Sequence, residues 1–199
     1  SKYNLNEADE VILTLSRLVP RKGMDVLIKA CAELQTSRPH LKLLVAGTGR
    51  DQRRLKNIAR RKEAPVTFLG HVPDEDIPNL YGLADLFSML CRVRWGGLEQ
   101  EGFGIVFLEA AAAGIPQLAG KSGGAGEAVL EGMTGKVVSS PKDVDSVKEA
   151  ICEILDDETR YQEMKKLSRQ RVETKFSYDH LAAAFHDSLL KLNGNSEGS

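Results

Sequence analysis

The sequence predicts an α/β domain with a Rossmann-like, doubly wound parallel sheet of about six strands. Its strand candidates are continuous apolar runs without polar alternation, such as VILTLS at 11–16 and LKLLVAG at 41–47, which indicates strands covered on both faces. These runs alternate with helical patterns, which indicates βαβ units and therefore a parallel sheet. The length of 199 residues suits one domain of about 150–200 residues.

Three strand–helix pairs fill the first half of the chain. Residues 23–34 show the helical spacing most clearly, since apolar residues recur there every three or four positions. The third helix is expected to open after Pro73 with three acids, which complement the helix dipole. In chain order, the predicted elements are a strand at 11–16, a helix at 23–34, a strand at 41–47, a helix at 51–61, a strand at 66–70 and a helix at 74–83.

The second half continues the alternation and then becomes helical. Its first helix is unusually apolar and rich in alanine, and the last seven residues, NGNSEGS, are small and polar. We expect a Rossmann-like domain over residues 1–177, a separate helix over 178–192 and a disordered tail over 193–199. The predicted elements are strands at 85–90, 115–119 and 136–139, and helices at 103–113, 126–131, 143–155, 158–175 and 178–192.

Composition restricts the function classes. The net charge of −1, with 42% apolar and 28% charged residues, is typical of a globular protein and argues against nucleic acid as a partner. The three cysteines are scattered without a CxxC pair, which favours reduced thiols and a cytoplasmic location. No apolar run approaches the ~18 residues of a membrane span.

One segment is strongly basic. Seven Lys or Arg residues lie between Arg50 and Lys62, mostly within the helix predicted at 51–61. Two interpretations are open: a solvated helix face, or a surface that contacts anionic lipid and places the protein peripherally on the inner face of the cell membrane.

Candidate ligand contacts follow the strands, where doubly wound sheets bind their ligands. Arg17 and Lys22 flank a proline turn after the first strand and offer two cations to a phosphate, the alternative being an ordinary charged loop. Gly47 and Gly49 follow the second strand as an incomplete dinucleotide fingerprint, which still permits a ligand close to the backbone. The acids Asp74–Asp76 fit a helix start better than a metal site, so no metal is expected.

The longest loop follows the fourth strand and ends in Glu101-Gly102-Phe103-Gly104, ahead of Glu109. Glycines that lead into a helix N-terminus favour an anionic ligand. If both glutamates were helical, about 12 Å along the axis would separate them. That spacing excludes a shared-proton pair and suits two separate grips on one extended ligand. Glu109 alone in so apolar a helix also requires a polar partner.

Together these segments resemble the C-terminal, donor-binding domain of GT-B glycosyltransferases of family 4, a large retaining family. The resemblance covers roughly residues 10–180, and the pattern Arg92-x-Arg94-x-Gly96-Gly97-Leu98 is most similar to the bacterial phosphatidylinositol mannosyltransferases. The motifs that carry it, in order, are Ser16-Arg17-Leu18-x-x-x-Lys22-Gly23, Val45-Ala46-Gly47-x-Gly49, Glu101-Gly102-Phe103-Gly104-x-x-x-x-Glu109-Ala110, Gly114-x-Pro116 and Ser122-Gly123-Gly124-x-x-Glu127.

The resemblance implies a role for each matching residue. Arg17 and Lys22 would hold the diphosphate of a UDP- or GDP-sugar and stabilise the leaving group without a metal, and Glu109 would bind the ribose hydroxyls. The remaining contacts would be Glu101, Gly102, Phe103 and Gly104 to the donor sugar, Ile105 and Val106 to the distal phosphate, Val72 and Asp74 to the base, and Gly49 beside the nucleotide.

Such enzymes carry the acceptor site on an N-terminal domain, which a chain of this length is expected to lack. The helix at 178–192 would cross to that domain. We therefore expect a donor-binding half that binds a nucleotide sugar and transfers little, with a hexose such as mannose moving to a lipid or glycan acceptor in the whole enzyme. The alternatives are a GT-B-like epimerase or phosphorylase, and a non-catalytic nucleotide-binding module.

Overall fold

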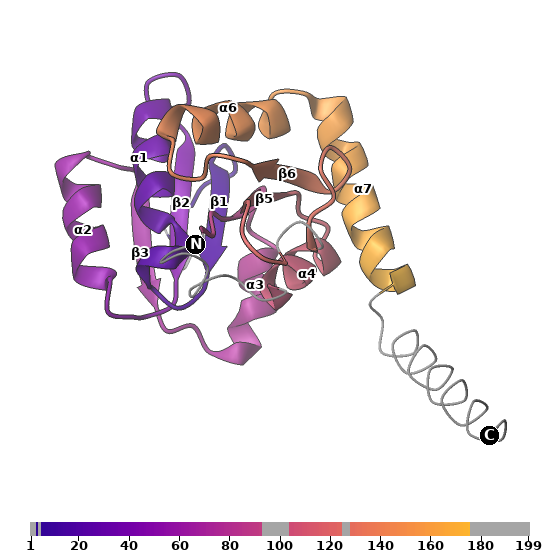
Figure 1. The fold of residues 1–199 in the computed structure, drawn as a ribbon, viewed down its shortest axis with the longest axis horizontal. Coiled ribbons are helices and arrows are strands. Elements are labelled where there is room, and N and C mark those ends of the chain that lie inside the picture. The colour runs from indigo at the N-terminus through magenta and orange to yellow at the C-terminus, as the bar shows by residue number, and fades with distance from the viewer. Residues whose placement is uncertain (1–2, 4, 93–103, 125–127, 176–199) are drawn as a thin grey trace, which may run out of the picture.

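The computed structural model describes residue 3 and residues 5–92, 104–124 and 128–175. Within these residues six strands form one sheet in the order β3-β2-β1-β4-β5-β6, and every pair is parallel (Figure 1). The doubly wound parallel class is therefore confirmed. The strands are β1 (Glu10–Leu15), β2 (Leu41–Ala46), β3 (Val66–Gly70), β4 (Leu86–Met89), β5 (Gln117–Gly120) and β6 (Gly135–Val138).

The helix predicted at 158–175 has its predicted bounds, and the other predicted helices that the structure describes have shifted ends. The helix expected at 74–83 divides into a 3-10 turn and a short α-helix. The helix expected at 103–113 begins only at Ile105, because Gly104 has a left-handed backbone with φ 73°. The helices are η1 (Pro20–Lys22), α1 (Met24–Leu34), α2 (Gln52–Arg61), η2 (Asp74–Asp76), α3 (Ile77–Tyr81), α4 (Ile105–Ala112), α6 (Val144–Leu155) and α7 (Glu158–Lys175).

Two predicted helices lie wholly or partly outside the described residues. They are the helix at 178–192 and the short helix at 126–131, which is wrong over residues 129–131 because these are described and are not helical. The tail predicted at 193–199 also falls outside them.

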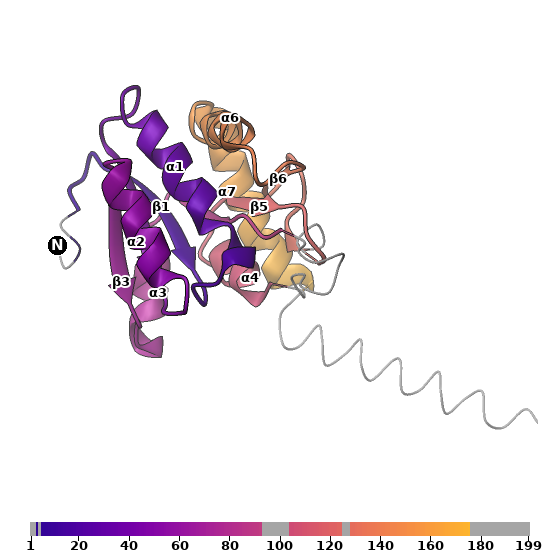
Figure 2. The ribbon, with the colours of Figure 1, turned by 60° about the vertical axis from the view of Figure 1, so that its left-hand side comes forward.

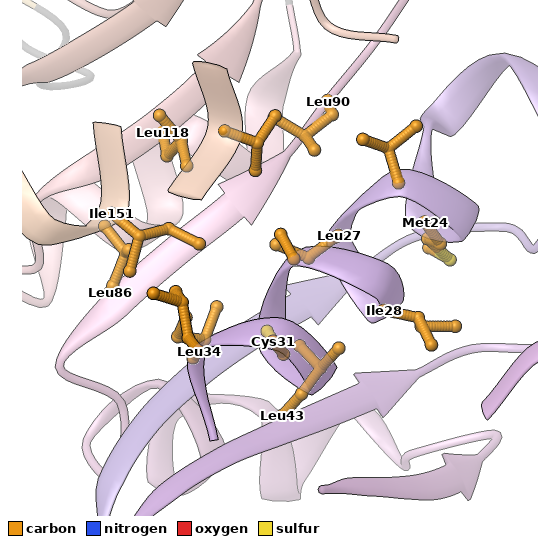
Figure 3. Close-up of a cluster of buried hydrophobic side chains, with 14 of the residues drawn as sticks. Met24, Leu27, Ile28, Cys31, Leu34, Leu43, Leu86, Leu90, Leu118 and Ile151 are labelled. Carbon is orange, nitrogen blue, oxygen red and sulfur yellow. The ribbon is translucent and has the colours of Figure 1, made fainter. Parts of the chain in front are cut away.

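One face of the sheet is covered by α1, α2 and α6. The buried cluster beneath them also includes residues of α7. Leu27 and Leu34 of α1 lie against Leu43 of β2 and Leu86 of β4, and all four side chains are buried (Figure 3). Figures 1 and 2 show α6 beside α1, with α2 near the β3 edge and α7 near the β6 edge. Removal of this apolar surface from water supplies most of the stabilisation of the layer.

The other face of the sheet packs against α3 and α4. The Phe107 ring of α4 meets Phe87 of β4 edge-on with centroids 5.5 Å apart, and Tyr81 of α3 packs against Phe87 at 5.8 Å. A helix as apolar as α4 needs such burial. This packing fixes the position of α4, whose N-terminal end faces the site described below.

The strand order places a topological switch point between β1 and β4. The chain leaves β1 toward β2 on one side of the sheet, whereas β4 leads to β5 on the other. The connections that leave such neighbouring strands diverge and leave a crevice at their carboxyl ends, where doubly wound domains bind ligands. Arg17 and Lys22 follow β1 at this crevice, whereas the segment containing Glu101 lies outside the described residues.

Candidate functional site

The loop after β1 carries two cations in different environments. Arg17 is exposed, whereas Lys22 is only 7% exposed and its Nζ donates to Met89 Sδ over 3.3 Å. Gly23 (φ 71°) ends η1, and a Cβ at this position would lie 2.0 Å from the Leu90 carbonyl oxygen. Glycine thus lets the loop close onto the end of β4, which brings the Lys22 ammonium to the switch point.

The loop after β2 packs directly onto the loop after β1. The Leu18 amide donates to the Thr48 carbonyl (2.9 Å), and the Asp51 amide donates to the Leu18 carbonyl (3.1 Å). A Cβ on Gly49 would lie 2.3 Å from the Leu18 carbonyl oxygen. Gly49 is therefore required for contact between the two loops, a reason that the fingerprint pattern did not suggest.

A shallow depression of about 330 Å³ lies where these two loops meet. Its walls are Arg17, Val19, Arg21, Gly49 and Arg50. Three guanidinium groups with no acid among the lining residues make the depression electropositive, and guanidinium groups suit phosphate oxygens. The structure thus brings Arg17 and Gly49 together, while Lys22 does not line this depression.

An ion-pair network that the sequence did not indicate supports the same loops. Asp25, in the first turn of α1, accepts from Arg92 Nη2 (2.9 and 3.0 Å) and from Arg54 Nη1 (3.2 Å). Burial alone would raise the pKa of Asp25, but Arg92 and Arg54 together hold it below its ordinary value. The Arg92 amide also donates to the Arg21 carbonyl (3.0 Å). Arg92 therefore ties the end of β4 to the loop after β1.

The segment before α4 is only partly described. Glu101, Gly102 and Phe103 lie outside the described residues. Gly104 is the N-cap of α4, and the next residues, Ile105 and Val106, belong to the first turn, whose N–H groups have no acceptor within a helix. Because α4 begins at Ile105, the helical distance expected between the two glutamates does not apply.

Glu109 lies about one turn from the start of α4, and its hydrogen-bond partner comes from α3. The Tyr81 hydroxyl donates to Glu109 Oε2 over 2.9 Å. The two residues line a cavity of about 730 Å³ together with Asp74 of η2, Ile77, Pro78, Ala112 and Ala113. Burial and the neighbouring Glu109 carboxylate raise the pKa of Tyr81, so its hydroxyl stays protonated and donates. The polar partner that Glu109 required is thus Tyr81.

Four of the candidate residues line one of two places within the described residues. Arg17 and Gly49 line the electropositive depression, whereas Asp74 and Glu109 line the cavity between α3 and α4. Val72 is buried, Val106 is half-buried and Ile105 is 68% exposed. The depression supplies cations that suit phosphate groups, and the cavity supplies carboxylates that can accept hydrogen bonds from hydroxyl or amine groups.

The described part of the chain holds neither a candidate metal cluster nor a helix able to span a membrane. No group of three or more His, Cys, Asp or Glu side chains there is arranged to hold a metal ion. None of its helices combines the length and apolar character that a membrane crossing requires.

Comparison with known sequences identifies relatives. The family described as "Glycosyl transferases group 1" matches residues 1–171. The chain is 43% identical over 178 residues to a Corynebacterium glutamicum protein named GDP-mannose-dependent monoacylated alpha-(1-6)-phosphatidylinositol monomannoside mannosyltransferase, covering 89% of this chain and 46% of that protein. A Mycobacterium tuberculosis GDP-mannose-dependent alpha-(1-6)-phosphatidylinositol monomannoside mannosyltransferase is 41% identical over 190 residues, covering 94% and 49%. The chain spans about half the length of these relatives.

Solved structures show the same fold. The Anabaena protein Alr3699/HepE, solved with UDP and glucose, superposes with a TM-score of 0.79 at 26% identity, over 92% of this chain and 49% of that one. The C-terminal domain of a Francisella tularensis glycosyl transferase group 1 protein superposes with a TM-score of 0.74 at 21% identity, over 85% of this chain and 87% of that domain. The second comparison is evidence for the fold alone.

The doubly wound sheet, the glycine-dependent loops at its switch point and the match over most of the chain agree with one another. The chain belongs to the group 1 glycosyl transferases, which have the GT-B fold.

Proposed function

We propose that the chain is the donor-binding half of a retaining glycosyltransferase and that it holds a nucleoside diphosphate sugar across the crevice between β1 and β4. The observation that carries this proposal is the pairing of an electropositive depression at Arg17 with a cavity in which Tyr81 holds Glu109. Cations suit the diphosphate and a fixed carboxylate suits the ribose hydroxyls. A single nucleotide has both groups.

The proposed chemistry is stabilisation of the leaving group. As the bond between sugar and phosphate breaks, negative charge grows on the diphosphate, and Arg17 and Lys22 offset that charge without a metal. The acceptor attacks from the face that the diphosphate leaves, which retains the sugar configuration. Glu101, Gly102, Phe103 and Gly104 contact the sugar in this proposal. Ile105 and Val106 face the distal phosphate through their amides, and Val72 and Asp74 contact the base.

The names of two relatives support a proposal for the donor and the acceptor. Two relatives above 40% identity are named as GDP-mannose-dependent enzymes that act on a phosphatidylinositol monomannoside. We therefore propose GDP-mannose as the donor and a lipid as the acceptor, with the acceptor bound by a part of the enzyme outside this chain. The chain alone should then bind GDP-mannose and transfer mannose slowly or not at all.

Calorimetry with GDP, UDP and NAD tests the proposal. GDP is expected to bind, NAD is not, and Lys22→Ala and Glu109→Ala should each weaken GDP binding about tenfold or more, since each removes a hydrogen bond to a charged group. Binding of NAD without either diphosphate would instead support a redox or non-catalytic module. A preference for UDP-N-acetylhexosamines that both variants leave unchanged would favour an epimerase. A full transfer rate from this chain alone would contradict the proposed half-site.

The basic helix α2 supports a second part of the proposal, a peripheral position on the anionic inner face of the cell membrane. Arg53, Lys56 and Arg60 are all exposed on α2, whereas its apolar residues Leu55 and Ile58 are buried. The named relatives are phosphatidylinositol monomannoside mannosyltransferases, and the phosphodiester of such a lipid is anionic. A cationic face near such a lipid gains about 1 kcal/mol per Lys or Arg.

Vesicle co-sedimentation tests the membrane contact. The chain should sediment with phosphatidylcholine vesicles that contain about a third phosphatidylglycerol but not with pure phosphatidylcholine, and added salt should release it. The double variant Arg53→Gln/Arg60→Gln should lose binding. The matched control is Lys166→Gln/Arg169→Gln on α7, which removes the same charge near the opposite sheet edge. Equal losses in both variants would show that only net charge matters, and the proposed surface would be wrong.

A further inference from the structure

Tyr81 is a buried residue whose hydroxyl reaches the candidate site. Its side chain comes from the last residue of α3 and is only 3% exposed. The hydroxyl lies 2.9 Å from Glu109 Oε2 and 3.3 Å from the Val106 carbonyl oxygen. The carboxylate is charged and nearer, so it is the stronger acceptor of the two.

The Tyr81 ring has little freedom to move. It packs against Phe87 of β4 at 5.8 Å between centroids, and Phe87 in turn packs edge-on against Phe107 of α4 at 5.5 Å. Phe87 and Phe107 are fully buried. A hydroxyl on a ring held by the core occupies a fixed point relative to α4.

Glu109 is exposed, and such a long side chain otherwise samples several rotamers, which costs free energy to order on binding. The bond from Tyr81 fixes one carboxylate oxygen, Oε2, toward α3. Both residues line the cavity that also contains Asp74. The second oxygen therefore has a restricted set of directions in which to accept a hydrogen bond from a ligand.

We propose that Tyr81 is a positioning residue for nucleotide recognition: it holds Glu109 in advance so that the carboxylate accepts hydrogen bonds from the two ribose hydroxyls. This inference rests on the proposed function, because it assigns the ribose to Glu109. Tyr81 itself contacts no ligand atom in this assignment. It acts through Glu109 alone, which separates its effect from a general effect on the fold.

The test compares GDP with 2′,3′-dideoxy-GDP, which lacks both ribose hydroxyls, by calorimetry. Tyr81→Phe keeps the ring and removes only the hydroxyl. It should weaken GDP binding about three- to tenfold, the range for one hydrogen bond, and leave dideoxy-GDP binding unchanged. In the background of Glu109→Gln, adding Tyr81→Phe should weaken GDP much less than it does in the wild type, since both changes act on one contact.

Tyr161→Phe is a matched control. Tyr161 is another buried tyrosine, and its hydroxyl donates to the Asp85 carbonyl oxygen over 3.0 Å, away from the site residues. The Tyr161→Phe variant should bind GDP and 2′,3′-dideoxy-GDP as tightly as the wild type does. Equal weakening of GDP and dideoxy-GDP by Tyr81→Phe would show a merely structural role and overturn the inference. Unchanged GDP binding in Tyr81→Phe, with Glu109→Gln weakened, would overturn it too while the proposed function stands. If the wild type fails to distinguish the two nucleotides, the ribose role of Glu109 fails as well.

Discussion

At the scale of single residues, the role of a side chain at the candidate site depends on the residues that it contacts. Gly49 matters because the Leu18 carbonyl lies where a side chain would begin, and Asp25 matters because Arg92 and Arg54 converge on it. Glu109 requires Tyr81 in the same sense. Each residue can be changed alone, with a similar residue elsewhere as its control.

Gly49→Ala should destabilise the fold by about 1–3 kcal/mol, the usual cost of forcing extra atoms into a packed site. The new Cβ would lie 2.3 Å from the Leu18 carbonyl oxygen, so the two loops must separate. Urea unfolding measures the change. Gly82→Ala is the control, because its Cβ would meet nothing closer than 3.4 Å, and it should stay within about 0.5 kcal/mol. Equal effects would mean that the contact between the loops is unimportant.

Asp25→Asn should lower the free energy of unfolding at pH 7 by about 1–3 kcal/mol, through loss of charged hydrogen bonds to Arg92 and Arg54. The folded pKa of Asp25 lies below its ordinary value of 3.8, so the unfolded chain takes up the proton first as pH falls. The stabilisation is therefore present above about pH 3.8 and is lost as pH falls through the folded pKa.

Urea unfolding of both proteins across this pH range checks the prediction, and the two stabilities should converge in acid. Asp145→Asn is the control, since the Asp145 side chain is 76% exposed and exposed ion pairs contribute little. A difference between Asp25→Asn and the wild type that persists unchanged in acid would contradict the electrostatic account.

At the scale of elements, α4 connects the core to the site. On its buried face Phe107 packs against Phe87 of β4, while the Glu109 side chain of the same helix lines the cavity. Its N-terminal end is set by the left-handed Gly104. The packing of this one helix therefore sets where the first-turn amides and the Glu109 carboxylate lie.

Phe107→Ala should cost about 3–5 kcal/mol of stability, the range for a buried phenylalanine. Because α4 would then pack loosely, GDP binding should weaken even at temperatures where the variant is folded. Thermal unfolding and calorimetry measure the two effects. Ile105→Ala is the control for stability: its side chain is 68% exposed, so its unfolding should change little. A folded Phe107→Ala variant with wild-type affinity would show that the position of α4 is not critical.

At the scale of the whole molecule, helices of the same chain cover both faces of the sheet. One buried cluster lies under α1, α2, α6 and α7 and the other under α3 and α4, and the buried apolar residues of both fall between Val11 and Met164. The crevice stands where the order of the strands reverses. The buried clusters and the proposed ligand site thus lie in the same part of the chain, although the proposed transfer reaction also needs an acceptor site.

Deletion of residues 178–199 should change the free energy of unfolding by less than about 1 kcal/mol, since both described clusters remain complete. Cooperative urea unfolding with an unchanged midpoint is the expected result. A loss of several kcal/mol, or a broad transition, would mean that this segment belongs to the domain and that the boundary expected at residue 177 is wrong.

Much of the fold could be predicted because it depends on local patterns. The strand at 66–70 was predicted with its observed ends, since an apolar run between turn residues defines it. The start of α4 was placed two residues too early, because the left-handed backbone of Gly104 is not visible in an apolar pattern. The roles of Arg17, Lys22 and Glu109 remain predictions from the resemblance.

The sequence by itself determined the class of fold, the order of its elements and the family, because apolar periodicity and ordered motifs are properties of the chain alone. Only the tertiary structure decided which residues support the site. Tyr81 and Glu109 are 28 positions apart, and Asp25 and Arg92 are 67 apart. The sequence predicts a polar partner for Glu109 but does not identify that residue. The choice is made where α3, α4 and β4 pack together, because only burial of their aromatic rings fixes the hydroxyl beside the carboxylate.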